Sequence, residues 1–447
     1  MSVSFLDAKL HAKSRASFRW RQSSCFRTRS TSCKALGEHM AGPLNGIRVL
    51  DLSSVLMGPS ATQALAEMGA SVIKVESLTG DTTRKIGPSA RTDSMGSNFL
   101  NMNRGKRSIA LDLKHPLGVK TLRQLLAQAD VLIHNIRPQA AARLGLSYEA
   151  VAAIKPDIVY CALNGFGSTG PYAGQSAYDD IIQGLAGLPA LGAQSGQAPR
   201  YVPTPIADRV AGLQAVIAVT GALLHRERTG EGQLVEVPMF ESMAHVVLSD
   251  HLYGRTFVPA RGEAGYTRVL SPSRHPYQTA DGYVCVLIYT DRHWAAFFDL
   301  VGRPDLAEDP RYATMRARNV NIDMLYGFVA ETLARKTTEA WLTAFRSVDI
   351  PAGPMNTLDT LIDDPHLNAV GFFEEIDHPS EGRLRALRAP VSWSRSHPES
   401  LCAAPNLGEH GLAILREAGL SEPEIAALYD AGVLGGPALE PAGRLER

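Results

Sequence analysis

Short apolar runs alternate with amphipathic segments through the first half of the chain. Residues 47–52 (IRVLDL) predict a strand, 59–69 (PSATQALAEMG) a helix that Pro59 opens and Gly69 closes, and 70–76 (ASVIKVE) a second strand. This order is a βαβ unit. Further strands are predicted at 107–113, 130–136 and 157–167, with a helix at 116–129. The N-terminal half therefore predicts a parallel α/β sheet.

A long segment at 209–225 is apolar on nearly every side of a helix, which predicts a buried helix, and 234–239 (LVEVPM) predicts a strand after it. The longest uncharged run, Val210 to Leu224, contains Gln214 and two glycines. It is shorter than the ~20 apolar residues of a membrane span. We therefore expect no membrane partner.

The pattern changes after about residue 255. Residues 262–288 predict loop and antiparallel hairpin, and helices are predicted at 292–302 and 321–336. From residue 350 turns and short strands resume, and the chain ends with predicted helices at 408–419 and 421–432. The middle region is therefore expected to form a smaller domain.

Composition narrows the class of protein. Lys and Arg number 45 and Asp and Glu number 45, so no global field attracts nucleic acid, and we expect no nucleic-acid partner. The five cysteines lack paired spacing, which argues against a disulfide framework and indicates a reducing compartment. The histidines show no metal-ligand spacing, so no metal site is expected.

The first 39 residues differ from the rest because they are rich in Arg, Lys and Ser and contain only Asp7 and Glu38 as acids. This composition also describes an organellar transit peptide. However, Met40 begins the segment MAGPLNGIRVLDLS and reads as a natural start. We expect residues 1–39 to form a non-native or disordered arm, and the protein to be cytoplasmic, or mitochondrial if the arm is a real transit peptide.

Two segments could bind a ligand. Residues 101–118 gather Arg104, Lys106, Arg107 and Lys114 near a predicted strand, as either a solvated rim or a polyphosphate site that Arg84, Arg137 and Arg143 would extend. Residues 165–180 are a Gly-rich loop ending in Tyr178 and Asp179, which would be a turn with a helix cap or the wall of a cleft. A dinucleotide site is not expected, because the loop after the first strand lacks the G-x-G-x-x-G pattern.

Asp208 stands where a short apolar run meets the long apolar helix, in the segment PTPIADRVAG. Asp is a preferred N-cap, because its side chain accepts the free N–H groups of the first helical turn. From this segment alone, a cap without further role and a reactive carboxylate both remain open.

Several motifs in order resemble the class III coenzyme A transferase family, which includes formyl-CoA:oxalate and carnitine CoA-transferases. They are GIRVLDLSSVLMGPSATQALAEMGASVIKVES, NRGKRSIALDLK, DVLIHNIRP, GFGSTGPYAGQSAYD and ADRVAGLQAV. The resemblance runs from about Pro43 to Val433. It implies a Rossmann-like large domain built from both ends of the chain, a smaller α+β domain, and an interlocked homodimer. The implied boundaries are 40–250 and 349–447 for the large domain and 251–348 for the small domain with its linkers.

The resemblance also implies the roles of single residues. The family's catalytic Asp falls on Asp208. The positions that contact CoA fall on Leu56 and Met57, on Leu111 to Lys114, on Asn135, Ile136 and Arg137, on Arg143, and on the turn from Ser176 through Tyr178 to Asp179. The implied reaction moves CoA from an acyl-CoA donor to a carboxylic acid through an aspartyl-CoA thioester. It needs no permanently bound cofactor and no metal, since the CoA thioester is the substrate.

Differences from the family pattern limit the substrate and the reaction. A family Arg near the adenine is Ser77 here, and a substrate-side Gln of the formyl-CoA enzymes is Leu56, so oxalate or formate chemistry is not expected. The similar 2-methylacyl-CoA racemases use a His where this chain has Tyr178. A phenol with a pKa near ~10 is a poor base at neutral pH, so transfer is favoured and racemisation is the alternative. Arg268, Arg274 and His275 could hold a dicarboxylate, which suggests succinyl-CoA as donor.

Overall fold

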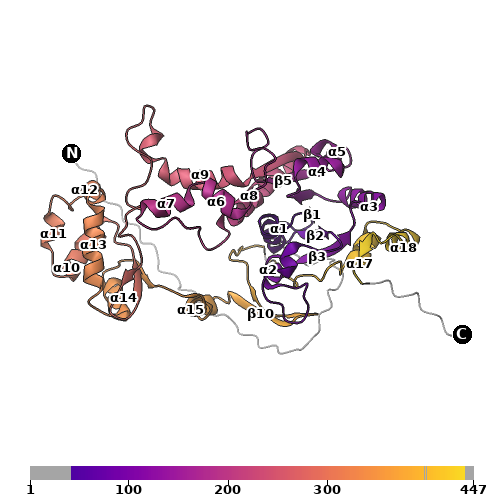
Figure 1. The fold of residues 1–447 in the computed structure, drawn as a ribbon. Helices are drawn as coiled ribbons and strands as arrows, with labels where there is room; N and C mark the ends of the chain where they lie inside the picture. The colour runs from indigo at the N-terminus through magenta and orange to yellow at the C-terminus, as the bar shows by residue number, and fades with distance from the viewer. Residues whose placement is uncertain (1–41, 397, 399, 438–447) are drawn as a thin grey trace, which may run out of the picture. The chain divides into compact units, whose positions relative to one another are not determined.

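The computed structural model describes residues 42–396, 398 and 400–437, and Figure 1 shows their course. The predicted arm at 1–39 lies outside these residues. The strands of the main sheet run in the order β12-β3-β2-β1-β4-β5-β6. Their bounds are β1 Arg48–Asp51, β2 Ser71–Glu76, β3 Lys106–Leu111, β4 Val131–His134, β5 Val159–Asn164, β6 Gln233–Pro238 and β12 Leu434–Gly435.

The main sheet is parallel except at one edge, where β12 runs antiparallel to β3. Alternate residues of β1, β2, β4 and β5 enter two separate hydrophobic cores, as for Val49 and Leu50 of β1. A sheet that is buried on both faces needs apolar residues at consecutive positions, which explains the continuous runs in the sequence. The predicted parallel α/β sheet is confirmed.

Helices cover both faces of this sheet. One core contains residues of α1 (Met57–Glu67), α6 (Asp179–Leu185), α8 (Ile206–Thr229) and α9 (Met239–His251). The opposite core contains residues of α3 (Pro116–Leu126), α4 (Pro138–Arg143), α5 (Tyr148–Ala152), α17 (Gly411–Glu417) and α18 (Glu422–Asp430). Two distant parts of the chain thus share a core, and Figure 1 shows yellow α17 and α18 beside strands of the indigo N-terminal half.

Helix α8 packs through its small residues. Ala207, Ala211 and Ala215 are buried, whereas Leu213 and Ile217 are each 63% exposed. The prediction of a helix buried on every side is therefore wrong, because close packing on α1 uses the alanine face and leaves larger apolar side chains outside. Within the described residues, α8 is the helix long and apolar enough to cross a membrane, but length and composition do not distinguish such a span from a core helix.

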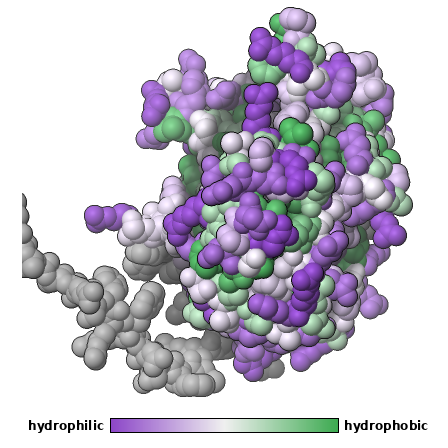
Figure 2. Space-filling view, turned by 90° about the vertical axis from the view of Figure 1, so that its left-hand side faces the viewer, coloured by the Kyte–Doolittle hydropathy of each residue, from purple (hydrophilic) through white to green (hydrophobic). Residues whose placement is uncertain are grey.

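Residues between 277 and 350 have a hydrophobic core of their own, centred on Phe297, Trp341 and Phe345. Its elements are β7 (Tyr277–Gln278), β8 (Tyr283–Val286), α10 (Asp291–Leu300), α11 (Asp305–Glu308), α12 (Met315–Val320), α13 (Ile322–Leu333), α14 (Thr338–Ser347) and β9 (Ala352–Pro354). Strands β7, β8 and β9 pair antiparallel, as the sequence predicts for the hairpin β7–β8. Figure 2 shows hydrophilic residues over much of one face of the molecule, with smaller hydrophobic groups between them.

The remaining elements connect these parts. Strands β10 (Phe373–His378) and β11 (Gly382–Leu387) form an antiparallel hairpin. The short helices are η1 (Thr82–Lys85), α2 (Ser97–Met102), α7 (Leu188–Gln194), η2 (Tyr253–Thr256), α15 (Leu358–Ile362) and α16 (Pro365–Ala369). Helix α9 was not predicted from the sequence, because it follows β6 directly at Met239 with no turn residues between them.

Candidate active site

The C-terminal ends of the parallel strands bring several loops to one edge of the sheet, which is where open α/β sheets bind ligands. The loop after β1 runs from Leu52 into α1, and the loop after β4 contains Asn135 to Arg137. The loop after β5 runs through the Gly-rich segment to Tyr178. The CoA-contacting residues that the family resemblance implies therefore lie mainly on loops of this edge.

Asp208 is a buried carboxylate in the first turn of α8, where its residue is only 8% exposed. Burial and the negative charge of Asp179 raise the pKa of Asp208 to about 6. Arg209 and a hydrogen bond from the backbone N–H of Met57 act in the opposite direction and are outweighed. The site therefore holds a carboxylate that is largely ionised at pH 7 but less stabilised than one in water.

The expectation that Asp208 is the N-cap of its helix is wrong. Helix α8 begins at Ile206 after Pro205, so Asp208 is its third residue, and no side chain of the N-cap residue makes a cap hydrogen bond. Instead, Asp179 of α6 accepts the backbone N–H groups of Ala207 (2.7 Å) and Asp208 (3.1 Å) through Oδ1. The cap is supplied from another helix, which leaves the Asp208 side chain free of that role.

The proximity of Asp179 adds to the rise in the pKa of Asp208 that burial causes. An N-terminal helix position favours an ionised carboxylate through the helix dipole. Here the nearby Asp179 carries the capping negative charge, so that Asp208 experiences repulsion as well as loss of water. Gln183 donates to Asp179 Oδ2 at 2.6 Å, which fixes the orientation of the capping carboxylate.

Most of the predicted polyphosphate cluster is used inside the fold. Arg84 is 1% exposed and forms two 2.8 Å hydrogen bonds with Glu76, so its assignment to CoA binding is corrected. Arg104 pairs with Glu374, and Lys106 is buried against Asp51. These side chains cannot reach a phosphate, because buried cations are kept by the carboxylates that neutralise them.

Arg107, the fourth cation of the predicted cluster at the start of β3, forms an ion pair with Glu417 of α17. It therefore joins the two distant chain segments that share a core. Lys114, by contrast, is exposed beyond the end of β3 and remains available to a ligand.

Exposed cations gather around a cavity of about 760 Å³ between α3 and the end of α4. Lys114 and Arg143, both singled out from the sequence, line it. Lys120 and Arg123 of α3 also line it, and sequence reasoning missed them. Their spacing of three residues on one helix was the available signal. Four cations around one cavity suit a polyanionic ligand.

The other predicted contact residues differ in what they can offer. Leu111 is 1% exposed within β3, so its side chain belongs to the core and cannot contact a ligand. Arg137 donates to the hydroxyl of Ser176, which joins the loops after β4 and β5. Tyr178 is 68% exposed next to Asp179. Ile136, in the loop after β4, is partly buried and packs against the core on the α3 side.

Leu56 and Met57 occupy the start of α1, where Leu56 is the N-cap residue. The side chain of Met57 is buried in the core and is not exposed to a ligand. The side-chain amide of Asn135 accepts the Ser54 N–H and donates to the Ser54 carbonyl, so it helps to fix the loop after β1. In the described part of the chain no group of His, Cys, Asp and Glu side chains has the arrangement of a metal site.

Comparison with known families gives one match over most of the chain. The family described as CoA-transferase family III matches residues 44–411. The succinate–glutarate CoA-transferase of Agrobacterium fabrum is 34% identical over 389 residues, which cover 84% of this chain and 95% of that protein. The formyl-CoA:oxalate CoA-transferase of Streptomyces coelicolor is 33% identical and is covered completely, with 88% of this chain aligned.

Solved structures agree with this match. A CaiB/BaiF family protein from Brucella suis is 34% identical with a TM-score of 0.71, and the similarity covers 84% of this chain and 99% of that one. A hypothetical protein from Mycobacterium tuberculosis is 29% identical with a TM-score of 0.73, covering 84% of this chain and 100% of that one.

Proposed function

The chain belongs to CoA-transferase family III, and from its site we propose that Asp208 is the nucleophile of the transfer. The enzyme moves CoA between an acyl-CoA and a carboxylic acid. The observation that carries the assignment of Asp208 is its position as a buried carboxylate in the first turn of α8. Covalent catalysis by a carboxylate divides a difficult exchange into easier steps.

The proposed sequence has four steps. The Asp208 carboxylate attacks the donor thioester carbonyl, forming an acyl-aspartyl anhydride and releasing CoA thiolate. The thiolate attacks the aspartyl carbonyl, forming the aspartyl-CoA thioester and releasing the donor acid. The acceptor carboxylate then attacks this thioester, forming a second anhydride and releasing the thiolate. Attack of the thiolate on the acceptor acyl carbon gives the new acyl-CoA and restores Asp208.

Burial of Asp208 supports this role in two ways. It keeps water away from anhydrides, which would otherwise hydrolyse. It also leaves the carboxylate poorly solvated, since the raised pKa of about 6 reflects lost hydration, and poor solvation makes the ionised group more reactive. A neutral pH still leaves most of the group ionised.

The cavity between α3 and α4 supports binding of CoA. Lys114, Lys120, Arg123 and Arg143 can neutralise the phosphates of the nucleotide. None of these four side chains forms an ion pair within the described residues. Hydrogen bonds from Ser421 lower the pKa of the exposed Glu424, and Lys120 also contributes to this lowering. Their charges are therefore available to a ligand, whereas Arg84, Arg104 and Lys106 are neutralised inside the fold.

A dicarboxylic acid is the substrate class that we propose. Relatives from Agrobacterium fabrum, Mus musculus and Haloarcula hispanica are named as transferases of succinate, glutarate or mesaconate. Arg274 and His275 line a separate cavity of about 590 Å³. Arg268 lies against the rings of Tyr266 and Tyr289 and could bind a second carboxylate. Succinyl-CoA is the proposed donor.

The exposed apolar face of α8 supports a homodimer, which we propose to be interlocked as the family resemblance implies. Leu213, Ile217 and Leu224 are exposed on this helix, and Ile181 and Leu185 are exposed on neighbouring α6. Large apolar side chains concentrated on adjacent helices are typical of a protein interface.

A covalent intermediate tests the nucleophile. The purified enzyme is incubated with succinyl-CoA without acceptor, and the peptide containing Asp208 is examined by mass spectrometry. We expect a CoA adduct on this peptide that is absent in Asp208→Asn and present in Asp180→Asn. Deuterium entering the α-carbon of a 2-methylacyl-CoA from heavy water, without an adduct, would instead indicate the racemase. A panel of mono- and dicarboxylic acceptors then defines the substrate.

A further inference from the structure

Helix α4 and its flanking turns form a short segment, residues 136–146, whose two ends are held by one pair of buried side chains. His134 is the last residue of β4, and Tyr160 lies on the neighbouring strand β5. These residues are 2% and 4% exposed. His134 Nδ1 accepts the N–H of Ile136 at 3.2 Å. The Tyr160 hydroxyl donates to the Leu146 carbonyl at 2.6 Å, so the pair reaches both ends of the segment.

A hydrogen bond of 2.6 Å between His134 Nε2 and Tyr160 Oη joins these two contacts. Because Nδ1 accepts from Ile136 and burial lowers the pKa of His134 to about 4, the neutral ring carries its proton on Nε2. Nε2 therefore donates to Tyr160 Oη. The Tyr160 hydroxyl then keeps its own proton for the Leu146 carbonyl, which can only accept. Each member of this buried chain has a partner, which makes such a chain rigid.

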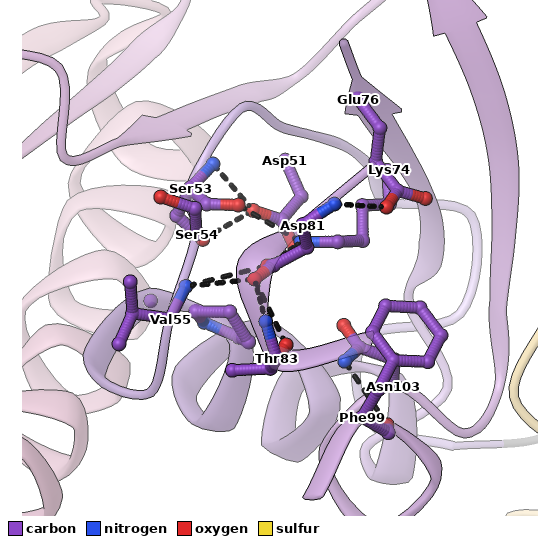
Figure 3. Close-up of polar contacts among 12 residues, drawn as sticks. Asp51, Ser53, Ser54, Val55, Lys74, Glu76, Asp81, Thr83, Phe99 and Asn103 are labelled. Atoms are coloured by element: carbon purple, nitrogen blue, oxygen red, sulfur yellow. Dashed lines mark hydrogen bonds and ion pairs between the residues drawn. The ribbon is translucent and has the colours of Figure 1, made fainter. Parts of the chain in front are cut away.

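The first end of the segment is also tied to the loop after β1. Asn135 accepts the Ser54 N–H at 3.0 Å and donates to the Ser54 carbonyl at 2.9 Å. Figure 3 shows how the next residue, Val55, is fixed by Asp81, which accepts its N–H at 3.3 Å. Lys74 donates to Asp81 at 3.0 Å, and both are buried, so water does not compete for these contacts. The start of the segment therefore has a second anchor besides the buried pair.

The other end of the segment carries cations of the cavity between α3 and α4. Arg143 is the last residue of α4, just before the turn to Leu146, and lines this cavity. Gly145 in the turn has a φ of 67°, and a Cβ there would lie 3.0 Å from Nη2 of Arg123. The Arg123 guanidinium thus lies against the turn, and Arg123 lines the same cavity. The hydrogen bond from Tyr160 therefore holds the turn that places both cations.

We propose that His134 and Tyr160 are positioning residues, which place Arg143 at the phosphates of CoA. This inference rests on the proposed binding of CoA in the cavity between α3 and α4. A guanidinium that is held in advance at a phosphate loses little freedom when the ligand binds, so the benefit appears in affinity. Asp208 belongs to α8, which packs in the core on the opposite face of the sheet, so the chemical step is not expected to change.

Tyr160→Phe is the direct test, because it keeps the ring and removes the hydroxyl that links His134 to Leu146. The dissociation constant of CoA is measured by calorimetry, and kcat is measured at saturating succinyl-CoA. We expect the dissociation constant to rise about tenfold, through the partial loss of a charge-assisted contact, while kcat changes less than about twofold. An unchanged dissociation constant, or a fall in kcat alone, would overturn the proposal.

Tyr148→Phe is the matched control. The ring of Tyr148 packs edge to face on that of Tyr160, with centroids 5.7 Å apart. Its hydroxyl makes no hydrogen bond to any other residue in the part of the chain that the structure describes. Removing this hydroxyl should leave both the dissociation constant and kcat unchanged. Equal effects of Tyr148→Phe and Tyr160→Phe would assign the result to ring packing and would contradict the proposal.

A double-mutant cycle distinguishes positioning of Arg143 from a general structural role of Tyr160. Arg143→Gln should weaken CoA binding, and adding Tyr160→Phe to it should weaken binding by less than about threefold more. Lys120→Gln removes a different cation of the same cavity, on α3. Adding Tyr160→Phe to Lys120→Gln should still weaken binding about tenfold, because Lys120 does not depend on the turn. Additive effects in both cycles would contradict the proposal.

His134→Asn is the second variant, and urea unfolding establishes that each variant is folded. The new amide oxygen can still accept the Ile136 N–H, whereas the donor to Tyr160 is lost. We expect the dissociation constant of CoA to rise about threefold, with no further rise when His134→Asn is added to Arg143→Gln. A dissociation constant that His134→Asn leaves unchanged would contradict the role of His134.

The same measurements separate this proposal from the proposed function. Unchanged CoA binding in Arg143→Gln would overturn both the proposal and the assignment of the cavity to CoA. Weakened binding in Arg143→Gln, together with unchanged binding in Tyr160→Phe, would overturn the positioning role alone. Because CoA binding is measured without an acyl group, the result does not depend on whether Asp208 is the nucleophile.

Discussion

At the scale of single residues, the charge on Asp208 is set first by burial and then by its neighbours. Burial and the repulsion of Asp179 raise its pKa to about 6, and Arg209 and the Met57 backbone oppose this rise without cancelling it. The nucleophile must be the carboxylate, so activity should fall as pH drops below about 6. Removing the charge of Asp179 should extend activity to lower pH.

Asp179→Asn tests this electrostatic coupling. The amide oxygen can still accept the N–H groups of Ala207 and Asp208, while the repulsion disappears. We expect the acidic limb of the kcat/KM profile to move to lower pH in this variant. Asp180→Asn, which alters the exposed neighbouring residue, should leave the limb in place. An identical limb in both variants would show that Asp179 does not govern the ionisation of Asp208.

The buried charge of Asp208 should also reduce the stability of the fold at neutral pH. The folded pKa of Asp208, about 6, lies above the ordinary value of 3.8, so the folded state binds this proton more tightly than the unfolded chain. The contribution of Asp208 to stability is therefore fully present below about pH 4 and is lost as pH rises through about 6. Asp208→Asn should raise the free energy of unfolding at pH 7 by on the order of 2 kcal/mol.

Urea unfolding of the wild-type chain and of Asp208→Asn at two pH values measures this effect. The difference between them should be large at pH 7 and should nearly disappear below about pH 3, where the carboxyl is mostly protonated in both states. A difference that is constant with pH would mean that the amide acts through packing and not through the lost charge.

At the scale of elements, the contact between α1 and α8 depends on Gly212. A methyl group there would lie 2.7 Å from Ser60 Oγ and 2.9 Å from the Met57 carbonyl, so one helix must move. Gly212→Ala should lower kcat about tenfold or more, since small displacements at a reacting centre have large effects. It should also reduce stability by about 1–3 kcal/mol through overpacking.

Gly221→Ala is the matched control on the same helix. No atom lies within 4 Å of a Cβ at this position. The substitution should therefore raise stability by up to about 1 kcal/mol through helix propensity and leave kcat unchanged. Steady-state kinetics and urea unfolding distinguish the two variants. Equal effects of both alanines would mean that helix propensity, and not the close approach to α1, governs the site.

The sequence predicts helices and strands better than it predicts the long-range side-chain contacts between them. Apolar runs such as 70–76 identify β2 and its neighbours, because a strand buried on both faces is rich in hydrophobic residues. The buried Lys74 and Glu76 of β2 are exceptions, and each forms an ion pair inside the fold. The cap of α8 could not be found this way, since Asp179 lies 28 residues before Ala207. Likewise, the sequence favours Arg104 as a phosphate ligand, but in the fold it donates to Glu374, which lies 270 residues away in the sequence. Such pairings depend on the tertiary fold.

At the scale of the whole molecule, the C-terminal segment of the chain completes one end of the main sheet. Strand β12 pairs with β3 through Leu434 and Leu111, and α17 and α18 pack on the same side as α3. Strand β3 is therefore not an edge strand, and the two-residue β12 beside it offers little backbone for pairing with another chain. We propose the exposed apolar face of α8 as the interface between two copies, because large apolar side chains are exposed there.

Substitutions on the exposed apolar face of α8 test the proposed dimer. Leu213 and Ile217 are each 63% exposed, and replacing both with Glu would place two charges in a desolvated interface. We expect the wild-type chain to have twice the mass of one chain by light scattering, and Leu213→Glu/Ile217→Glu to lose this species. Val320→Glu, at a residue that is 80% exposed on α12, should retain it.

Because an interlocked pair cannot separate without unfolding, loss of the dimer should coincide with a lower unfolding temperature. A double variant that keeps the dimer mass would place the interface elsewhere.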